Sequence, residues 1–567
     1  MTTQLEFCYA HEKERPDRVW LTQPLGGGAS PSSLALRAAR PEDIAGRNVF
    51  VRDFTWRQVM DEARRVATYL RARGFPPKSQ IALWSKNSAW WIISDLAIWM
   101  AGHVTVPLYP TLTAETIRQI INHSEAKLVI VGKLDGFDRM KAGIPEGMPI
   151  VTTPLAPLVE GATKWEDVLR ESEPLEENTK RDEDELATIV YTSGSTGVPK
   201  GVMHSFRTMC TATMFLDIVH LRSEDRVLSY LPLAHVMERA AVEIPSMKVG
   251  THIYFAESLD TFLDDLRRAR PTMFMSVPRL WSKFQQGIYS KIEPKRLQRL
   301  LSIPIVKNFI RKRILGGLGL DQVRYAASGS APLAEDLWSF WGSLGLELLE
   351  GYGMTENFAI SHGTRPGEAR IGYIGRPHDG VEQRITEQGE IWVKSPGTML
   401  GYFKAPDLTK EILDDEGFLH TGDRGVLDEK KRLKVTGRVK ELFKTSKGKY
   451  VAPAPIENVL MEHADVEQAM VAGAGMPQPF GMVVLSEAAR KRAKDDMASS
   501  LAAHLKKTNA ALDPHEHLQK LVVLSESWTI ENGLLTPTMK VKRDAIEKRY
   551  ADKVSRWYDD EPTVLWD

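Results

Sequence analysis

The sequence predicts an α/β protein in which parallel-rich sheets are covered by helices. Between residues 59 and 132, segments with the apolar spacing of a helix alternate with short apolar runs typical of buried strands. Alternation of this kind is typical of parallel strands joined by crossover helices. After about residue 380 the pattern changes to short strands separated by turn residues, which predicts a smaller β-rich part.

The individual elements follow from the spacing of apolar and turn residues. A helix is predicted over 59–73, because one of its faces carries Val59, Ala63, Val66 and Leu70. It is followed by strand 81–84, helix 89–101, strand 104–108, helix 113–122 and strand 128–132. Thr113 is a suitable N-cap for the last of these helices.

Later segments are shorter or less regular. A strand at 186–190 precedes a Gly/Ser-rich loop, and the β-rich part has strands at 383–386, 389–394 and 432–435. Beyond Gly437 helical and strand patterns alternate again. The stretch 145–182 is rich in Pro, Glu and Thr and is predicted to be a long surface excursion.

Composition excludes several classes of protein. Of 567 residues, 43% are hydrophobic and 26% are charged, as in ordinary globular proteins. Lys and Arg together number 74, as do Asp and Glu, which argues against a nucleic-acid-binding protein that relies on a global basic field. Cys8 and Cys210 are too few for a disulfide framework, and we expect Cys210 to be a small buried residue in a reducing compartment.

No targeting or membrane-spanning segment is predicted. Residues 1–8 lack a basic stretch followed by an apolar one. The most apolar segment, 90–110, is interrupted by Asp95, Gly102 and His103, whereas a membrane span needs about 20 apolar residues. We therefore expect a buried helix leading into a strand, and a cytoplasmic protein whose contact with the inner face of a membrane, if any, is peripheral.

A loop dense in hydrogen-bond donors follows the strand at 186–190. Glycines let backbone N–H groups approach an anion, hydroxyls add donors, and Lys200 adds a positive charge, a combination suited to a polyphosphate. The loop differs from the Walker motif because Pro199 precedes the lysine and Gly201 follows it. The expected nucleotide-binding residues are Thr192, Ser193, Gly194, Ser195, Thr196 and Gly197. The alternative is an ordinary Gly/Ser-rich turn.

The loop at 191–201 resembles the phosphate loop of the adenylate-forming superfamily, which contains acyl-CoA synthetases, adenylation domains of peptide synthetases and firefly-type luciferases. A second segment, Gly351-Tyr-Gly-Met-Thr-Glu356, resembles the adenine and metal segment of that family. Gly351 and Gly353 flank Tyr352, whose ring can stack on a purine. Thr355 can hold a phosphate oxygen, and Glu356, together with Thr196, is expected to ligate Mg²⁺.

Two further segments extend the resemblance toward the adenine and the acid. The run 327–333 resembles the backbone strip that lies against the adenine and contains Ser328 and Gly329. The run 231–236 resembles the segment beside the carboxylate pocket, which makes His235 a candidate for that pocket. A lone histidine can equally be a structural residue.

The resemblance also divides the chain into domains. Asp423 is expected to accept the ribose hydroxyls, and Arg438 can donate to phosphate or ribose. By position, Lys440 is the hinge between an N-terminal adenylation domain, 1–437, with its β-rich subdomain at about 380–437, and a small, mobile α+β C-terminal domain, 438–567. Many relatives carry Asp at the hinge position.

The catalytic residues expected from the resemblance are Lys540, Thr355, Glu356 and Lys200. Family members place one lysine near the C-terminus on a loop that enters the active site. Lys540 fits that motif directly after 536–539, and Lys542 is the competitor two residues further on. After rotation of the C-terminal domain, Ser446, Lys447 and Gly448 are expected to face the tunnel for the pantetheine of CoA, although this loop can equally be a solvated basic turn.

Within the superfamily, segments 443–453, 276–281 and 107–112 most resemble long-chain fatty acyl-CoA synthetases. This implies a Mg²⁺- and ATP-dependent ligase that joins a fatty acid to CoA through an acyl-AMP. The alternatives are an acyl-AMP ligase with a carrier-protein pantetheine or another acceptor, a medium-chain or aryl acid CoA ligase, and a non-catalytic acyl-nucleotide sensor. Trp281 is expected either at a tunnel mouth or in the core.

A basic segment points to a further contact. Residues 283–313 contain nine Lys or Arg and one acidic residue, Glu293, with interleaved Leu and Ile. A peripheral membrane contact and a solvated helical face are both consistent with this pattern. The oligomeric state is left open by the sequence.

Overall fold

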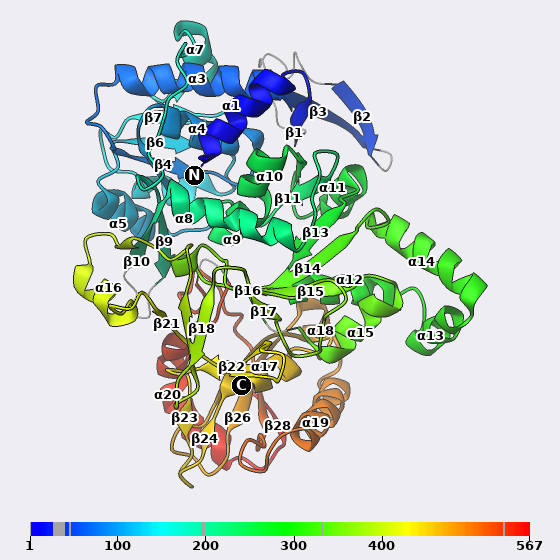
Figure 1. The fold of residues 1–567 in the computed structure, drawn as a ribbon. Coiled ribbons are helices and arrows are strands. Elements are labelled where there is room, and N and C mark those ends of the chain that lie inside the picture. The colour runs from blue at the N-terminus through cyan, green and yellow to red at the C-terminus, as the bar shows by residue number, and fades with distance from the viewer. Residues whose placement is uncertain (1, 27–39, 45–46, 194–198, 332, 537–538) are drawn as a thin grey trace.

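The protein is described by a computed structural model that covers the chain except residues 1, 27–39, 45–46, 194–198, 332 and 537–538. For residues 40–44, 47–48 and 193, only the backbone is described. The fold is mixed α/β, with the C-terminal part packed below the larger N-terminal part in Figure 1. Among the described residues, no helix is long and apolar enough to cross a membrane.

An eight-stranded sheet forms the centre of the N-terminal part. Its order is β20-β10-β9-β5-β4-β6-β7-β8, parallel from β9 to β8, with β10 and β20 added antiparallel at one edge. The strands are β4 (Gln80–Trp84), β5 (Val104–Leu108), β6 (Leu128–Val131), β7 (Ile150–Thr152), β8 (Thr163–Lys164), β9 (Leu186–Ser193), β10 (Pro199–Ser205) and β20 (Gly401–Tyr402).

The helices around this sheet confirm the predicted alternation. They are α1 (Gln4–Glu14), α3 (Trp56–Ala72), α4 (Ala89–Met100), α5 (Ala114–Ser124), the short α6 (Phe137–Met140) with the turn η1 (Lys141–Gly143), and α7 (Trp165–Glu171). Every residue of α4 is buried, as expected for the interrupted apolar segment. Thr113 caps α5 by accepting a hydrogen bond from the Thr116 backbone N–H.

The predicted surface excursion at 145–182 is partly wrong. It supplies β7 and β8 at the edge of the large sheet, together with α7. Trp165 at the start of α7 is buried, and its indole N–H donates to Glu62 at 2.9 Å. Strands of two or three residues leave too short a periodic pattern to be read from sequence, so only the turn residues between them were visible.

A second sheet contains β11, β12, β1, β3 and β2 in that order, and a third contains β13 to β17 in chain order. The second consists of β1 (Val19–Pro24), β2 (Arg40–Ile44), β3 (Arg47–Thr55), β11 (Arg226–Ser229) and β12 (His252–Phe255). The third consists of β13 (Met273–Ser276), β14 (Tyr325–Gly329), β15 (Leu348–Tyr352), β16 (His362–Gly363) and β17 (Arg376–Pro377).

Short helices and turns connect these sheets and carry several of the predicted motifs. They are α8 (Phe206–Cys210), η2 (Thr211–Asp217), α9 (Val236–Glu238), the π-helical turn η3 (Arg239–Glu243), α10 (Ile244–Val249), α11 (Phe262–Ala269) and η4 (Thr355–Asn357). Longer helices are α12 (Pro278–Tyr289), α13 (Pro294–Ser302), α14 (Pro304–Leu318) and α15 (Glu335–Ser343). Cys8 and Cys210 are both free and buried, as expected for Cys210.

The remaining sheets lie toward the C-terminus. An antiparallel sheet contains β18 (Glu382–Ile385), β19 (Glu390–Lys394), β21 (Leu419–Leu427) and β22 (Leu433–Arg438), with α16 (Pro406–Ile412) before β21. The C-terminal part contains a ribbon of β23 (Phe443–Lys444) and β24 (Tyr450–Val451) and a sheet of β25 (Val466–Ala472), β26 (Phe480–Leu485), β27 (Leu521–Leu524) and β28 (Val564–Trp566). Its helices are α17 (Pro453–Leu460), α18 (Glu487–Arg490), α19 (Lys494–Ala510) and α20 (Arg543–Asp559).

A fully buried ion cluster joins the large sheet to the helices that cover it. The Arg239 guanidinium donates to Glu243 at 2.7 Å, to Thr188 at 3.0 Å and to Asp95, and it lies over the rings of two α4 tryptophans. The side chains of Arg239, Asp95 and Glu243 all have 0% exposure. Because isolated charges are costly to bury, these groups stabilise the fold only as a complete set.

Replacing Arg239 with Leu should strongly destabilise the protein. The substitution leaves two buried carboxyl groups without their cation, a change that typically costs about 3–5 kcal/mol. Urea unfolding followed by circular dichroism measures the loss. The matched control is Arg57→Leu, which breaks the exposed pair with Asp17 and should leave the unfolding midpoint unchanged. Equal midpoints for Arg239→Leu and wild type would contradict the assigned role.

Glu243 should make stability depend on pH. Burial raises its pKa from 4.5 to about 8, so the folded protein holds a proton that the unfolded chain releases. This contribution is complete below pH 4.5 and is lost as the pH rises through about 8. Glu243→Gln cannot ionise, so its free energy of unfolding should decline less over this range than that of wild type. Urea titrations at several pH values measure the difference, and parallel curves would contradict it.

Candidate functional site

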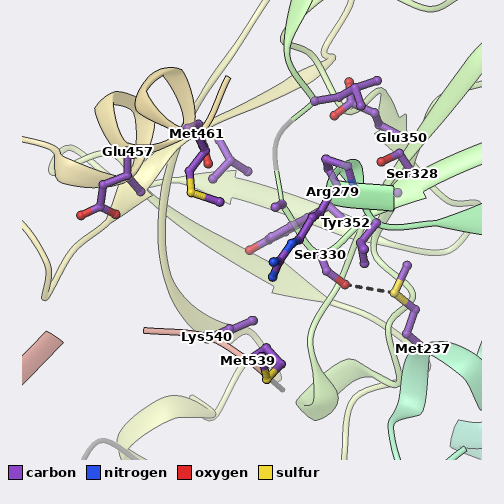
Figure 2. Close-up of a pocket in the computed structure, with 18 of the residues that line it drawn as sticks. Met237, Arg279, Ser328, Ser330, Glu350, Tyr352, Glu457, Met461, Met539 and Lys540 are labelled. Carbon is purple, nitrogen blue, oxygen red and sulfur yellow. Dashed lines mark hydrogen bonds between the residues drawn. The ribbon is translucent and has the colours of Figure 1, made fainter. Parts of the chain in front are cut away.

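The predicted nucleotide motifs and the end of the chain meet at one large cavity between the N- and C-terminal parts. The cavity has a volume of about 3990 Å³ and is lined by β14, β15, the β21–β22 pair, the start of α9 and the loop before α20. This volume is large enough to hold more than one ligand. Figure 2 shows Lys540 and Met539 of the C-terminal part below the end of the Arg279 side chain, with Ser330 and Tyr352 to the right.

The phosphate loop joins two antiparallel strands, as its position after a strand predicts. Thr192 of β9 pairs with Lys200 of β10, and the Thr192 side chain lines the cavity. Gly194, Ser195, Thr196 and Gly197 lie outside the described residues, as does the side chain of Ser193. Lys200 lies 5.3 Å from the ring centroid of Tyr402 rather than in the cavity wall.

The expected adenine segments end two neighbouring parallel strands. Ser328 and Gly329 of β14 pair with Glu350 and Gly351 of β15. Gly351 faces open space, because a Cβ there would meet no atom within 4 Å, so its lack of a side chain keeps room for a ligand. The Ser328 hydroxyl is buried and has no hydrogen-bond partner among the described residues.

Close packing requires glycine at one further position. A Cβ at Gly353 would lie 2.3 Å from the backbone of Ala359, whereas one at Gly329 would lie 2.6 Å from the methyl carbon at the flexible end of the Met237 side chain. Gly353 therefore allows the close approach to Ala359, while Gly351 leaves open space on the face of the sheet.

Tyr352, Asp423 and Arg438 form one polar group. The Tyr352 hydroxyl donates to Asp423 at 2.8 Å, and the Arg438 guanidinium pairs with the same carboxylate at 3.0 Å. Asp423 and Arg438 face each other across β21 and β22. Burial and the Asp423 carboxylate raise the pKa of Tyr352, so its hydroxyl remains a donor. The three residues line the cavity together and are suited to the hydroxyls of a ribose.

Glu356 is held in place by residues that sequence reasoning missed. The Tyr402 hydroxyl donates to its carboxylate at 2.8 Å, and the Met399 N–H donates to its carbonyl at 2.8 Å. The carbonyl of Thr355 accepts from the imidazole of His204 at 2.7 Å. Burial lowers the pKa of His204 to about 4, so the ring is a neutral donor. No motif announces His204 or Tyr402, because their partners are far away in sequence.

His235 lines the cavity as a neutral ring. Its Nδ1 accepts from the Met237 N–H at 3.0 Å, which leaves the proton on Nε2. Burial, and secondarily the charge of Lys540, lower its pKa to about 4. His235 is therefore both a cap of α9 and a donor available to a ligand.

A buried network supports the loop that carries His235, and it too was missed. Glu238 accepts from the Ser229 hydroxyl at 2.7 Å and from the Tyr230 N–H at 3.0 Å, while Asn87 binds Leu231 and Leu233 through their backbones. Burial raises the pKa of Glu238 to about 8. Asn87 sits just beyond β4, so this network ties the His235 loop to the large sheet.

Lys540 reaches the site from a tight loop after Leu535. The backbones of Thr536 and Lys540 are joined by a hydrogen bond of 2.8 Å, and Met539 between them has a φ of 62°. Protein around the ammonium, and secondarily Arg438, lower the pKa of Lys540, whereas the charges of Asp423, Glu441 and Glu356 oppose this. The charge of Lys540 also acts on His235. Lys542 lines the cavity as well, but it stands at the N-cap of α20.

The expected hinge and CoA residues lie in different places. Lys440 follows β22 in an exposed turn that borders the cavity, three residues after Gly437, whose φ of 143° favours glycine. Ser446, Lys447 and Gly448 form the exposed turn between β23 and β24 and do not line the cavity in this arrangement. Trp281 is a fully buried core residue that donates to the Ala327 carbonyl, so the tunnel-mouth alternative is wrong.

Comparison with known families decides the relationship of the chain. A family model described as AMP-binding enzyme matches residues 36–403, and one described as AMP-binding enzyme C-terminal domain matches 441–562. The chain belongs to the AMP-binding enzymes.

Several relatives cover most of this AMP-binding enzyme. A long-chain acyl-CoA synthetase 6 of Arabidopsis thaliana, named as peroxisomal, is 29% identical over 90% of this chain and 82% of its own. The human long-chain-fatty-acid–CoA ligase 1 is 29% identical over 89% and 82%, and FadD15 of Mycobacterium bovis, named as a long-chain-fatty-acid–CoA ligase, is 28% identical over 90% and 93%.

Solved structures share the fold. The adenylation domain of a carboxylate reductase from Mycobacterium chelonae has a TM-score of 0.80 at 22% identity and covers 98% of this chain and 91% of its own. MatB from Rhodopseudomonas palustris, solved with ATP, has a TM-score of 0.72 at 24% identity and covers 97% and 99%.

Asp423→Asn should weaken nucleotide binding. The variant keeps the shape of the side chain but removes the charge that Tyr352 and Arg438 hold. Hydrogen bonds to charged groups contribute about 1.5–3 kcal/mol, so the Kd for ATP should rise about tenfold to a hundredfold. Calorimetric titration with a non-hydrolysable ATP analogue measures it. The matched control is Asp428→Asn, at an Asp–Arg pair of the same sheet outside the cavity. Unchanged affinity in Asp423→Asn would contradict the assignment.

Proposed function

We propose that this AMP-binding enzyme is an ATP-dependent fatty acyl-CoA ligase. In the first step a fatty acid carboxylate oxygen bonds to the α-phosphorus of ATP, the bond from that phosphorus to the bridging oxygen breaks, and pyrophosphate leaves. In the second step the sulfur of CoA bonds to the acyl carbon, AMP leaves, and the thiol proton is released. The observation that carries the proposal is that Lys540 lines the same cavity as His235, Glu356 and Asp423, with its charge acting on that of His235 and the two carboxylates acting on its own.

Electrostatics explains the need for this lysine. The first step brings a carboxylate to a phosphate, and catalysis of phosphoryl chemistry depends mainly on positioning and on charge stabilisation. The Lys540 ammonium bridges the two anions, while neutral His235 donates a hydrogen bond without competing for a proton. Arg438 adds positive charge beside Asp423, the carboxylate that is proposed to bind the ribose hydroxyls.

The nucleotide is proposed to bind the residues around the open space beside Gly351. The adenine is proposed to lie against Gly351, in the open space at the ends of β14 and β15, with Ser328 as a polar neighbour. The ribose hydroxyls bind Asp423, and the 192–197 loop with Thr355 holds the phosphates. Lys200 is proposed to turn from Tyr402 toward the phosphates when they bind.

The donor set fits Mg²⁺. Among the described residues there is no cluster of three or more His, Cys, Asp or Glu able to hold a metal. A single carboxylate, that of Glu356, held by Tyr402, suits an ion that takes most of its oxygen ligands from phosphates and water. Glu356 and Thr196 would hold it, and when bound it would offset phosphate charge.

The second step is proposed to need a different position of the C-terminal domain, 438–567. Rotation about Lys440 removes Lys540 and brings Ser446, Lys447 and Gly448 toward the pantetheine of CoA. Their present exposure outside the cavity is the reason for requiring this movement. Placing the lysine and the thiol-facing loop on one moving domain prevents both from occupying the site together.

A long-chain fatty acid is the proposed acid, because relatives that match most of the chain are named for that substrate. Apolar residues of α13, such as Leu297 and Leu301, line the same cavity as His235, which suits an alkyl chain. The cytoplasmic location and the membrane contact of residues 283–313 stay predictions from the sequence.

The test is the formation of AMP and an acyl thioester from ATP, CoA and an acid. Short-, medium- and long-chain acids and an aryl acid should be compared with each acceptor, CoA and a pantetheinylated carrier protein. The proposal expects the highest kcat/KM with a long-chain acid and CoA. Preference for an aryl acid would indicate an aryl acid CoA ligase, and preference for the carrier would indicate an acyl-AMP ligase that loads a carrier protein. Absence of acid-dependent pyrophosphate exchange would indicate a non-catalytic acyl-nucleotide sensor.

Lys540→Ala should separate the two steps. Loss of a preorganised charged donor typically costs about a hundredfold to a thousandfold in rate, so acid-dependent pyrophosphate exchange should fall by that factor. Thioester formation from supplied acyl-AMP and CoA should persist, because the lysine is absent from the second arrangement.

Lys542→Ala is the control and should retain most of both steps. If Lys542→Ala rather than Lys540→Ala loses pyrophosphate exchange, Lys542 is the catalytic lysine. Equal loss of both steps in Lys540→Ala would contradict a two-position C-terminal domain.

A further inference from the structure

We propose that the hairpin of α13 and α14 docks on an anionic phospholipid surface through a face formed by Ile303, Ile305 and Phe309 within a basic border. This inference narrows the predicted contact of 283–313 to particular side chains. Its link to the supply of fatty acid rests on the proposed function, whereas the docking itself does not.

The hairpin projects from the body of the protein. Figure 1 shows α13 and α14 extending together away from the N-terminal part, beyond α12 and α15. Its inner side is anchored by Leu297, Leu301, Ile314 and Leu315, which join the core around Trp281 and Trp341. The hairpin therefore has a fixed inner face and a free outer one.

The outer face is apolar where solvent would favour polar residues. Ile305 is 87% exposed, Phe309 is 64% exposed and Ile303 is 49% exposed. Ile305 and Phe309 are four residues apart on α14, so they share one side of the helix, and Ile303 precedes its first turn. A cluster of three large exposed apolar residues indicates a binding surface rather than a solvated face.

Positive charge surrounds this apolar cluster. Lys295, Arg296, Arg299, Lys312 and Arg313 are exposed, and segment 283–313 has one acidic residue, Glu293. Among the described residues, the nine basic side chains of this segment form no ion pair with a carboxylate. Exposed basic side chains without a carboxylate partner remain available to phosphate headgroups.

The combination fits a lipid surface better than a protein partner. Isoleucine and phenylalanine can enter the boundary between headgroups and acyl chains while lysine and arginine reach the phosphates. A single apolar insertion binds weakly, and an added basic border strengthens it only on anionic lipid. An acidic protein partner would use the charges but would not explain three exposed apolar side chains on a projecting hairpin.

The position of the hairpin relates docking to the cavity. Leu297 and Leu301 line the cavity from α13, on the side of the helix that faces the core. One helix therefore borders the proposed acyl path while its neighbour α14 carries the docking residues. A docked molecule would hold the apolar end of the cavity near the membrane, where fatty acids dissolve.

Vesicle co-sedimentation of the full chain tests the proposal. Wild type should bind vesicles of phosphatidylcholine mixed with phosphatidylglycerol, bind pure phosphatidylcholine much less, and lose binding as salt increases. The double variant Ile305→Ser/Phe309→Ser should lose about tenfold or more of this affinity. Arg296→Glu/Arg299→Glu/Lys312→Glu should lose the preference for anionic vesicles. None of these residues lines the cavity, so thioester formation from dissolved acid should be unchanged.

A matched control removes an equally exposed apolar residue elsewhere. Leu158 is 92% exposed, and Leu158→Ser should bind vesicles as wild type does. Equal vesicle binding by wild type and both hairpin variants would overturn the proposal. Failure of wild type to co-sediment with either kind of vesicle would also overturn it. If wild type binds anionic vesicles but forms no thioester from dissolved fatty acid, the proposed function is refuted and the docking proposal is retained.

Discussion

The rest of the proposed site depends on one electrostatic constraint, namely that a carboxylate must approach a phosphate although both are anions. Lys540 of the C-terminal part supplies a positive charge, which interacts with His235, Glu356 and Asp423 of the N-terminal part. Its lowered pKa reflects surrounding protein and Arg438, so the site holds this cation at some cost. An anionic ligand bound beside the ammonium would remove that cost, which couples closure of the two parts to the presence of substrate.

Three buried groups that support the site are neutral at pH 7. Burial lowers the pKa of His204 and of His235 to about 4, and it raises that of Glu238 to about 8. Neutral His204 and His235 can orient the Thr355–Glu356 turn and the wall of the acid pocket, and Glu238 gains charge only as the pH rises toward about 8. The charge of the site is then set by Lys540, Arg438, Glu356 and Asp423, together with the ligands. Because the buried supporting groups are neutral at pH 7, they do not alter this balance of charges in the proposed site.

The sequence was informative where a local pattern carries the signal. The alternation of 59–132 predicted the central sheet because each strand and helix is long enough to show its period, and Thr113 was identified as a cap by its neighbours alone. His204 and Tyr402 could not be found this way, because each acts on the Thr355–Glu356 turn from a distant segment. The strands within 145–182 were missed because pairing with β6, not their own composition, makes them strands. Contact across the fold, which a single sequence does not encode locally, accounts for these omissions.

The contacts between the two parts of the molecule suit a domain that changes position. Arg279 pairs with Glu467 and Lys507 approaches Asp336 at 3.8 Å, and all four side chains are well exposed. Exposed pairs of this kind contribute little, about 0–1 kcal/mol each. The buried cluster around Arg239, by contrast, lies entirely within the N-terminal part. A ligand that favours one arrangement by only a few kcal/mol can therefore select it, and its departure can release Lys540. Weak contacts across this boundary are what the proposed movement needs, in which the C-terminal part withdraws Lys540 and brings the turn at 446–448 toward the site.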